Sequence, residues 1–109
     1  MKTEFDHIAI TTKDVAASIE FYKKQFDDVE VLYEDSTWGY LKCGGIKIAL
    51  VTSKEHPPHI CFRVGSKAEL LKYAAKTGST IKVHRDKTES FYLYDSSRNA
   101  IEIILYPES

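Results

Sequence analysis

The stretch Phe5-Asp6-His7-Ile8-Ala9-Ile10 is followed later in the chain by a related one, Pro57-Pro58-His59-Ile60-Cys61-Phe62. Each stretch has a histidine at its third position, and the offset of 52 residues between the two histidines also carries Tyr40-Leu41 onto Tyr92-Leu93. A repeat of this kind predicts two copies of one supersecondary unit. Each copy is expected to begin with a strand that carries a histidine.

The first copy has the pattern of a strand, a helix and three further strands. Alternating apolar residues, many of them β-branched, predict strands over residues 4–11, 29–34, 37–43 and 45–52. Thr11-Thr12-Lys13-Asp14 supplies the chemistry of a helix start. The helix that follows is expected to bury one apolar stripe, which consists of Val15, Ile19, Tyr22 and Phe26.

The second copy has the same order of elements. Its strands are expected over residues 58–64, 80–85, 90–95 and 100–106. Ser66-Lys67-Ala68-Glu69 has the form of a capping box, and Gly78 is a suitable helix stop. The apolar side of this second helix is expected to consist of Leu70, Leu71, Ala74 and Ala75.

These patterns predict an α+β fold made of two βαβββ modules with curved mixed sheets. We expect a single domain over residues 1–109, with modules at 4–52 and 58–106 and His56-Pro57-Pro58 as the linker. A sheet covered by a helix on one face leaves its other face open. Two such modules are therefore expected to form a metal-binding cleft.

The composition excludes several classes of function. Hydrophobic residues make up 43% and charged residues 28% of the 109 residues, and the net charge is −1. This gives no basic field for nucleic acid, and no apolar run reaches the length of a membrane span. Because no signal peptide is recognisable, we expect a cytoplasmic protein, in which Cys43 and Cys61 are free thiols.

Three potential metal ligands are out of phase with the bulky aliphatic residues of their strands. His7 alternates with Ile8, His59 with Ile60, and Glu102 with Ile101 and Ile103. The aliphatic faces should pack on the helices, so the three polar side chains should point to the open side. Two histidines and one carboxylate can hold a divalent metal with positions left for substrate. Alternatively, the histidines are ordinary sheet residues and Glu102 is solvated.

The other two histidines have no counterpart in the repeat. His56 is interpreted as a linker residue and His84 as a surface strand residue.

Three segments together resemble the vicinal oxygen chelate superfamily, which includes glyoxalase I, extradiol dioxygenases, fosfomycin-modifying enzymes and bleomycin-binding proteins. The segments are Asp6-His7-Ile8-Ala9-Ile10, Ala17-Ser18-Ile19-Glu20-Phe21-Tyr22-Lys23, and Phe91-Tyr92-Leu93-Tyr94-Asp95 with Asn99-Ala100-Ile101-Glu102. The resemblance implies metal ligands at His7, His59 and Glu102. It also implies a homodimer, in which the metal site is completed within one chain or across the two.

One position departs from the four-ligand glyoxalases. Where they carry a second carboxylate, this chain has Lys47, which cannot bind a metal while protonated. The site therefore looks three-ligand, and glyoxalase I activity is not expected. Lys82 and Ser90 match positions of the fosfomycin-modifying enzymes and are candidates for anion contacts. Other family features of those enzymes are missing, so fosfomycin is not assigned as the substrate.

The leading hypothesis is a metal-dependent lyase, transferase or dioxygenase acting on a small oxygen-bearing molecule by Lewis-acid activation. The metal is expected to be Fe, Mn, Zn, Ni or Co. Tyr92 is the candidate proton donor, and the substrate contacts are expected among Lys82, Ser90, Arg63, Trp38 and Tyr40. The aromatic residues and Arg63 have ordinary structural interpretations as well. The competing hypotheses are a metal-free drug-binding protein and one half of an assembly without chemistry of its own.

Overall fold

The computed structural model describes residues 2–52, 54 and 57–107, so His56 of the expected linker lies outside the described residues. The chain divides into two compact units. The N-terminal unit runs from His7 to His59, and the C-terminal unit combines the residues up to Asp6 with those from Ile60 onward. Strand β1 (Glu4–Thr11) therefore begins in the C-terminal unit and ends in the N-terminal one.

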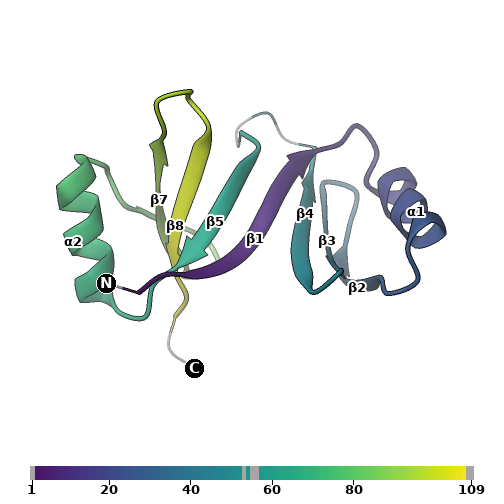
Figure 1. Ribbon diagram of the computed structural model, residues 1–109, viewed down its shortest axis with the longest axis horizontal. Coiled ribbons are helices and arrows are strands. Elements are labelled where there is room, and N and C mark those ends of the chain that lie inside the picture. The colour runs from purple at the N-terminus through teal and green to yellow at the C-terminus, as the bar shows by residue number, and fades with distance from the viewer. Residues whose placement is uncertain (1, 53, 55–56, 108–109) are drawn as a thin grey trace. The chain divides into compact units, whose positions relative to one another are not determined.

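The N-terminal unit contains one helix beside a mixed sheet with the strand order β2-β3-β4-β1 (Figure 1). Helix α1 (Val15–Gln25) is followed by β2 (Glu30–Glu34), β3 (Trp38–Cys43) and β4 (Ile46–Val51). β1 pairs in parallel with β4, and β3 is antiparallel to both of its neighbours. The expected order of a strand, a helix and three strands is confirmed, and each strand lies within a residue of its predicted bounds.

The core of the N-terminal unit lies between α1 and its sheet. It is formed by Val15, Ile19, Leu41, Ile48 and Leu50, with Ile8 and Ile10 packed against it. The expected helix-facing side of β1 is thus confirmed. Asp14 begins the helix by accepting a hydrogen bond from the Ala17 amide at 3.0 Å. Phe26, expected at the end of the buried stripe, instead follows the helix and is 47% exposed, because the helix ends one residue before it.

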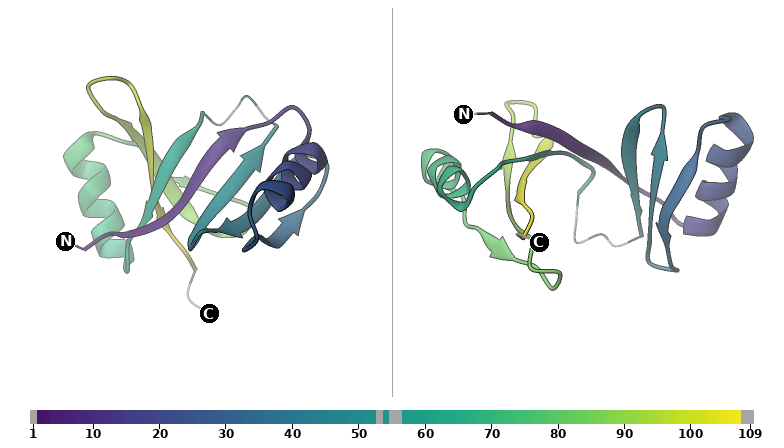
Figure 2. Two further views of the ribbon diagram at one scale, coloured as in Figure 1. Left: turned by 45° about the vertical axis from the view of Figure 1, so that its right-hand side comes forward. Right: turned by 90° about the horizontal axis from the view of Figure 1, so that it is seen from below.

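The C-terminal unit repeats this arrangement with the strand order β1-β5-β8-β7-β6. It contains β5 (His59–Arg63), whose first residue belongs to the other unit, and α2 (Lys67–Thr77), β6 (Lys82–Val83), β7 (Glu89–Tyr94) and β8 (Ala100–Leu105). The strand expected over residues 80–85 is only two residues long. Figure 2 shows each helix lying along one face of the strands of its own unit.

Helix α2 has the ends that the sequence predicts. Ser66 accepts a hydrogen bond from the Glu69 amide at 3.2 Å, and Gly78 closes the helix in the left-handed region at φ 69°. The core under this helix consists of Val64, Leu70, Ala74, Phe91 and Ile103.

The apolar side of α2 differs from the prediction at two positions. Leu71 is 51% exposed and Ala75 is also exposed, so neither belongs to the buried side. The half-buried Tyr73 packs against the core instead. The reason is geometric, since Leu70 and Ala74 are four residues apart and already define the side that faces the sheet.

Within the described residues, no helix combines the length and the apolar character that a membrane crossing would require.

Candidate functional site

His7 and His59 lie side by side in the N-terminal unit. A ring nitrogen of each lies within 4.8 Å of one on the other. The ring centroids are 5.5 Å apart and the rings meet at 71°, close to edge-to-face. His7 lies in the middle of β1, and His59 is the first residue of β5. The repeat position thus brings two imidazoles within reach of one common ion.

The hydrogen bond of His59 determines which ring nitrogen carries a lone pair. Its Nδ1 lies 2.8 Å from the carbonyl oxygen of Pro57. Because a carbonyl oxygen only accepts hydrogen bonds, Nδ1 is the donor, and in the neutral ring the lone pair is on Nε2. The Nε2 atom is buried. A backbone carbonyl that holds one nitrogen of a histidine is the usual orienting partner when the other nitrogen binds a metal.

The third predicted ligand, Glu102, lies in the C-terminal unit on β8. Its neighbours Ile101 and Ile103 pack toward α2, so the carboxylate is on the opposite face of the sheet, as the alternation predicts. Glu102 is buried, with 7% of its surface exposed. A buried carboxylate is costly unless it is compensated by a partner or an ion.

Tyr92 lies directly across from Glu102 in the register of β7 and β8, on the same face. Burial is the main cause that raises the pKa of Tyr92, and the Glu102 carboxylate raises it further. The phenol therefore keeps its proton over the ordinary pH range. It is a hydrogen-bond donor beside the carboxylate.

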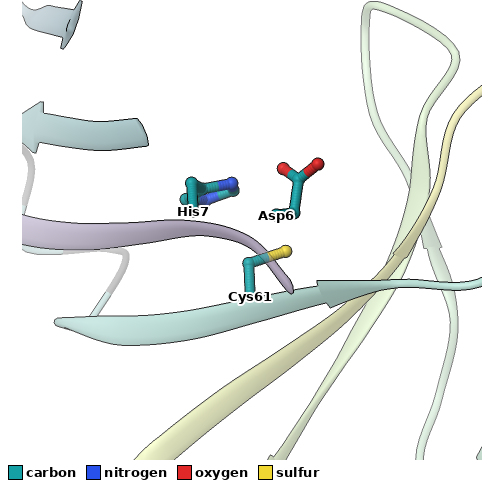
Figure 3. Close-up of side chains that lie close together, drawn as sticks. All are labelled: Asp6, His7 and Cys61. Carbon is teal, nitrogen blue, oxygen red and sulfur yellow. The ribbon is translucent and has the colours of Figure 1, made fainter. Parts of the chain in front are cut away.

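Cys61 is a second buried group on this face, and it was not among the predicted site residues. Its sulfur lies within 4.8 Å of a carboxylate oxygen of Asp6, which comes from the adjacent strand β1 (Figure 3). Burial raises the pKa of Cys61 well above its usual range, and the neighbouring Glu102 and Asp6 carboxylates add to the effect. The group is a thiol that interacts with Glu102, and it is not a reactive thiolate.

Arg63 is engaged by two carboxylates of β1. Its guanidinium donates to Asp6 at 3.1 Å and to Glu4 at 2.5 Å. The other oxygen of Asp6 accepts a hydrogen bond from the Tyr106 hydroxyl at 2.6 Å. These contacts raise the pKa of Arg63 and tie the two ends of the chain to β5. Arg63 thus stabilises the C-terminal unit, and its charge is balanced without a bound anion.

Ser90 and Lys82 are backbone partners across β7 and β6, but their side chains have different surroundings. Ser90 is 1% exposed and Lys82 is exposed. The hydroxyl of Ser90 lies 2.7 Å from Nε2 of His84. His84 was expected to be a surface strand residue, and this is corrected: it follows the short β6, is half-buried and is bonded to Ser90.

Trp38 and Tyr40 lie on the face of β3 that is opposite the α1 core, together with His7. The ring centroids of His7 and Tyr40 are 6.0 Å apart, and those of Tyr40 and Trp38 are 5.8 Å apart. Tyr33, which was not among the predicted site residues, stacks on Trp38 with centroids 4.8 Å apart. A row of four rings therefore crosses the open face of the N-terminal unit.

The site residues that were not predicted have little in the sequence that would identify them. Tyr33 and Trp38 flank a turn, and their pairing depends on a bulge between Val31 and Tyr33 that alternation does not predict. Asp6 and Tyr106 are 100 residues apart, so no local pattern connects them. Cys61 is two residues after His59 in the same strand, so alternation places both on one face. That phase was the sequence signal that could have identified Cys61 as a site residue.

Comparisons with known proteins agree with this arrangement of elements. The family model for the Glyoxalase/Bleomycin resistance protein/Dioxygenase superfamily matches residues 4–103. The search of curated proteins returned no match.

Several solved structures are similar in fold. A hypothetical protein, BH1468 from Bacillus halodurans C-125, has a TM-score of 0.75 at 18% identity, with 100% of this chain and 98% of that one covered. A methylmalonyl-CoA epimerase variant from Streptomyces coelicolor, in complex with 2-nitronate-propionyl-CoA, has a TM-score of 0.73 at 17% identity, with 99% and 100% covered. A superfamily member from Vibrio splendidus 12B01 has a TM-score of 0.67 at 14% identity, with 95% and 97% covered.

The identities to these structures show a common fold, and the family assignment depends on the match over residues 4–103. That match includes both histidines of the repeat and Glu102. The expected α+β fold of two βαβββ modules is confirmed as glyoxalase-like. The chain belongs to the glyoxalase/bleomycin resistance protein/dioxygenase superfamily.

Proposed function

We propose that the protein is a divalent-metal-dependent enzyme acting on a small oxygen-bearing substrate, with His7, His59 and Glu102 as the metal ligands. The observation that carries the proposal is the histidine pair of the N-terminal unit. Its nitrogens lie within 4.8 Å of each other, and the Pro57 carbonyl turns the lone pair of His59 to the buried Nε2. Two neutral imidazoles and a carboxylate suit Fe, Mn, Zn, Ni and Co.

The third ligand is proposed from the repeat and from its burial. Glu102 is in the phase of its strand that the sequence predicts, and it is a 7% exposed carboxylate. A divalent cation would compensate that buried charge. When bound, the cation would act as a Lewis acid toward an oxygen of the substrate.

Tyr92 is proposed as the group that donates a hydrogen bond or a proton to the substrate. It pairs with Glu102 across β7 and β8, and its hydroxyl keeps its proton. General acids of this kind must lie within hydrogen-bond reach of the atom they serve. Ser90 and Lys82 remain candidates for anion contacts. The His84 contact already occupies the Ser90 hydroxyl, which makes Lys82 the more accessible of the two.

The position of the N-terminal unit that matches Glu102 bears on the reaction class. The sequence comparison placed Lys47 there, but the strand register corrects this to Ala49: Tyr40, which the offset of 52 residues relates to Tyr92, pairs with Ala49 as Tyr92 pairs with Glu102. Because alanine has no ligand atom, we propose a three-ligand site without glyoxalase I activity. Methylmalonyl-CoA epimerases are among the similar structures, at 14–18% identity. A CoA ester is accordingly a substrate to include in activity screens, alongside other small oxygen-bearing molecules.

Metal binding is tested by equilibrium dialysis of the purified protein against micromolar Fe(II), Mn(II), Zn(II), Ni(II) and Co(II), followed by elemental analysis. We expect one ion per chain. Replacing a ligand, as in His7→Ala, His59→Ala or Glu102→Gln, should weaken binding at least roughly a hundredfold, because losing even an outer-shell partner costs about 10–100-fold. His84→Gln and Glu20→Gln are the matched controls and should bind as the wild type does.

A protein that neither retains nor gains a divalent ion would contradict the enzyme proposal and support the metal-free binding protein. Ligand variants that bind the metal as tightly as the controls would contradict the assignment of the ligands.

We also propose a homodimer, from the resemblance that the sequence shows. Small-angle scattering should give twice the mass of one chain. A monodisperse monomer would refute this part of the proposal and leave the ligand assignment to the dialysis.

A further inference from the structure

The open face of the N-terminal unit carries more aromatic and cationic groups than a metal site needs. Tyr33, Trp38, Tyr40 and His7 form a continuous row of rings, and Tyr33 and Trp38 are 44% and 37% exposed. Large exposed aromatic side chains that touch one another present π faces for a planar ligand. The row ends at His7, the first ligand of the proposed metal site.

The turn between β2 and β3 holds the outer part of the row in place. One carboxylate oxygen of Asp35 accepts hydrogen bonds from the amides of Thr37 and Trp38 at 2.7 and 2.9 Å. The other oxygen accepts from the hydroxyl of Tyr33 at 2.6 Å. These contacts hold the pKa of Asp35 well below its usual range. The hydroxyl of Tyr33 and the backbone of Trp38 are thus both held by one carboxylate, which lowers the entropic cost of binding against this turn.

A floor of small side chains lies beside the rings. In the register of the sheet Tyr40 is opposite Ala49, and Ala49 is opposite Ala9. Cross-strand partners share a face, so the two alanines lie on the same side as Tyr40. Both alanines are buried, and their short side chains lie beside Tyr40 on this face.

Two lysines stand directly opposite each other at one end of this face. Lys42 on β3 is paired with Lys47 on β4, and Lys42 is two residues from Tyr40 on the same face. Like charges at opposed positions repel each other. Glu30, which lies across from Lys42 on β2, is a single opposite charge beside the two lysines. Among the described residues no ion pair is formed by Lys42 or Lys47, so an excess positive charge remains beside the rings.

We propose that this face binds a planar aromatic anion, with its ring on Tyr40 and Trp38 and its anionic group between Lys42 and Lys47. The inference deepens the proposed function, on which it rests, by naming the substrate class of the same site. The geometry of the face favours this class because the π faces and the positive charge lie within two residues of each other along β3. A neutral ring or a non-aromatic acid would use only half of the face.

Trp38 makes the proposal directly measurable, because it is the one tryptophan of the chain. Metal-free full-length protein is titrated with benzoate while the fluorescence of Trp38 is recorded. Cyclohexanecarboxylate supplies the charge without the ring, and benzamide supplies the ring without the charge. We expect a saturable change with benzoate and binding roughly three- to tenfold weaker for each of the other two. AMP is a further probe, in which a phosphate and a purine ring provide the same chemistry.

Variants separate the contributions of the ring and of the charge. Tyr40→Leu should weaken benzoate binding roughly three- to tenfold, whereas Tyr40→Phe should bind as the wild type does. Lys42→Gln and Lys47→Gln should each weaken it about two- to fivefold and reduce its dependence on salt. Phe21→Leu and Lys24→Gln, both on α1, are matched controls and should leave binding unchanged.

Tighter binding of AMP than of benzoate would support the proposal and identify a nucleotide-like source for the anion. Equal affinities for benzoate, benzamide and cyclohexanecarboxylate would overturn it, and so would lysine variants that bind benzoate like the controls. Because the titration uses metal-free protein, its failure is distinct from a failure of metal binding in dialysis.

Discussion

The two units have the same strand order, but they fill the space under their helices in opposite ways. In the C-terminal unit Phe91 on β7 is 2% exposed and packs with Leu70 and Ala74 of α2. The same offset of 52 residues relates Phe91 to Gly39 on β3, where Val15 and Ile19 of α1 come down onto the backbone. At this position of the repeat the C-terminal unit has a bulky sheet residue, and the N-terminal unit has a glycine that is covered by helix side chains. The same position is therefore filled from the sheet in one unit and from the helix in the other.

The open faces of the two units have diverged further than their cores. The C-terminal unit has the buried Glu102, with Tyr92 across from it. The matching strand of the N-terminal unit has Lys47, with Lys42 across from it. Open-face residues are not needed for packing against the helix, so they are free to specialise. The open face of the C-terminal unit thus has a buried carboxylate, and that of the N-terminal unit has a pair of lysines.

The contrast between the two cores is tested most strongly by removing the ring of Phe91 from the C-terminal unit. Phe91→Ala should lower the free energy of unfolding by about 3–5 kcal/mol, because a fully buried phenylalanine leaves a cavity that rigid neighbours fill only in part. Urea unfolding followed by circular dichroism measures the change. Phe21→Ala, at a position 57% exposed, is the control and should cost far less.

A loss for Phe91→Ala as small as that of the control would mean that the α2 core can collapse around the missing ring. The presence of a bulky residue at this position of the sheet would then contribute little to the free energy of unfolding.

The opposite change should break the N-terminal unit. A Cβ added at Gly39 would lie 2.8 Å from Cγ1 of Val15 and 3.1 Å from Cδ1 of Ile19. Gly39→Ala should therefore destabilise the protein by about 1–3 kcal/mol through overpacking. The measurement is again urea unfolding. Gly65→Ala is the matched control, since a Cβ there meets nothing within 4 Å, and it should leave stability unchanged or slightly raised.

If Gly39→Ala were as stable as Gly65→Ala, helix α1 would have room to move away from β3. The short distance between α1 and β3 would then not require a glycine at position 39.

The charge difference between the open faces can be removed with one substitution. Lys47→Glu gives the open face of the N-terminal unit a carboxylate on β4, two residues before Ala49, the position that matches Glu102 in the strand register. In the register of β1 and β4, residue 47 precedes the pair Ile8–Ile48 just as His7 does, so the new carboxylate lies beside a proposed ligand. We expect metal affinity to rise roughly tenfold, since an added anionic ligand tightens binding of a divalent ion. Equilibrium dialysis measures it, with Lys24→Glu as the control.

The same variant should bind benzoate more weakly than the wild type, because the lysine pair is lost. A rise in metal affinity with unchanged benzoate binding would separate the two sites. Unchanged metal affinity would place residue 47 beyond reach of the ion.

The element order and the open faces were predictable from sequence because both follow local periodicity. Alternation correctly assigned Ile8, Ile10, Phe62 and Ile103 to the helix-facing sides of their strands. The repeat then identified His7 and His59 as neighbours in their unit. These inferences required no knowledge of how distant segments contact one another.

What could not be predicted depends on contacts between distant segments or on where an element ends. His84 was assigned to a strand that proved to be two residues long, and its bond to Ser90 follows from that early end. Asp6 is bonded by Arg63 and Tyr106, from two other parts of the chain. The pairing of Tyr33 with Trp38 depends on a β-bulge. No periodic pattern contains such information.

The helix starts provide the smallest difference between the units. Ser66 caps α2 by accepting from the Glu69 amide at 3.2 Å, and Asp14 caps α1 by accepting from the Ala17 amide at 3.0 Å. Ser66→Ala should lower the free energy of unfolding by about 1 kcal/mol, because one amide of the first turn loses its acceptor. Ser66→Asp should retain the wild-type value, since its carboxylate accepts the same bond and also favours the helix N-terminus.

Urea unfolding of Ser66→Ala, Ser66→Asp and Asp14→Ala, with the exposed Ser36→Ala as control, measures these differences. The two alanine variants should lose similar amounts, because each removes one acceptor from one helix. A much larger loss for Ser66→Ala would show that α2 depends on its cap more than α1 does. That result would be consistent with their cores, because the buried residues of α2 are Leu70 and the small Ala74, whereas those of α1 are Val15 and Ile19. Equal losses would instead place the whole asymmetry of the units in their cores and open faces.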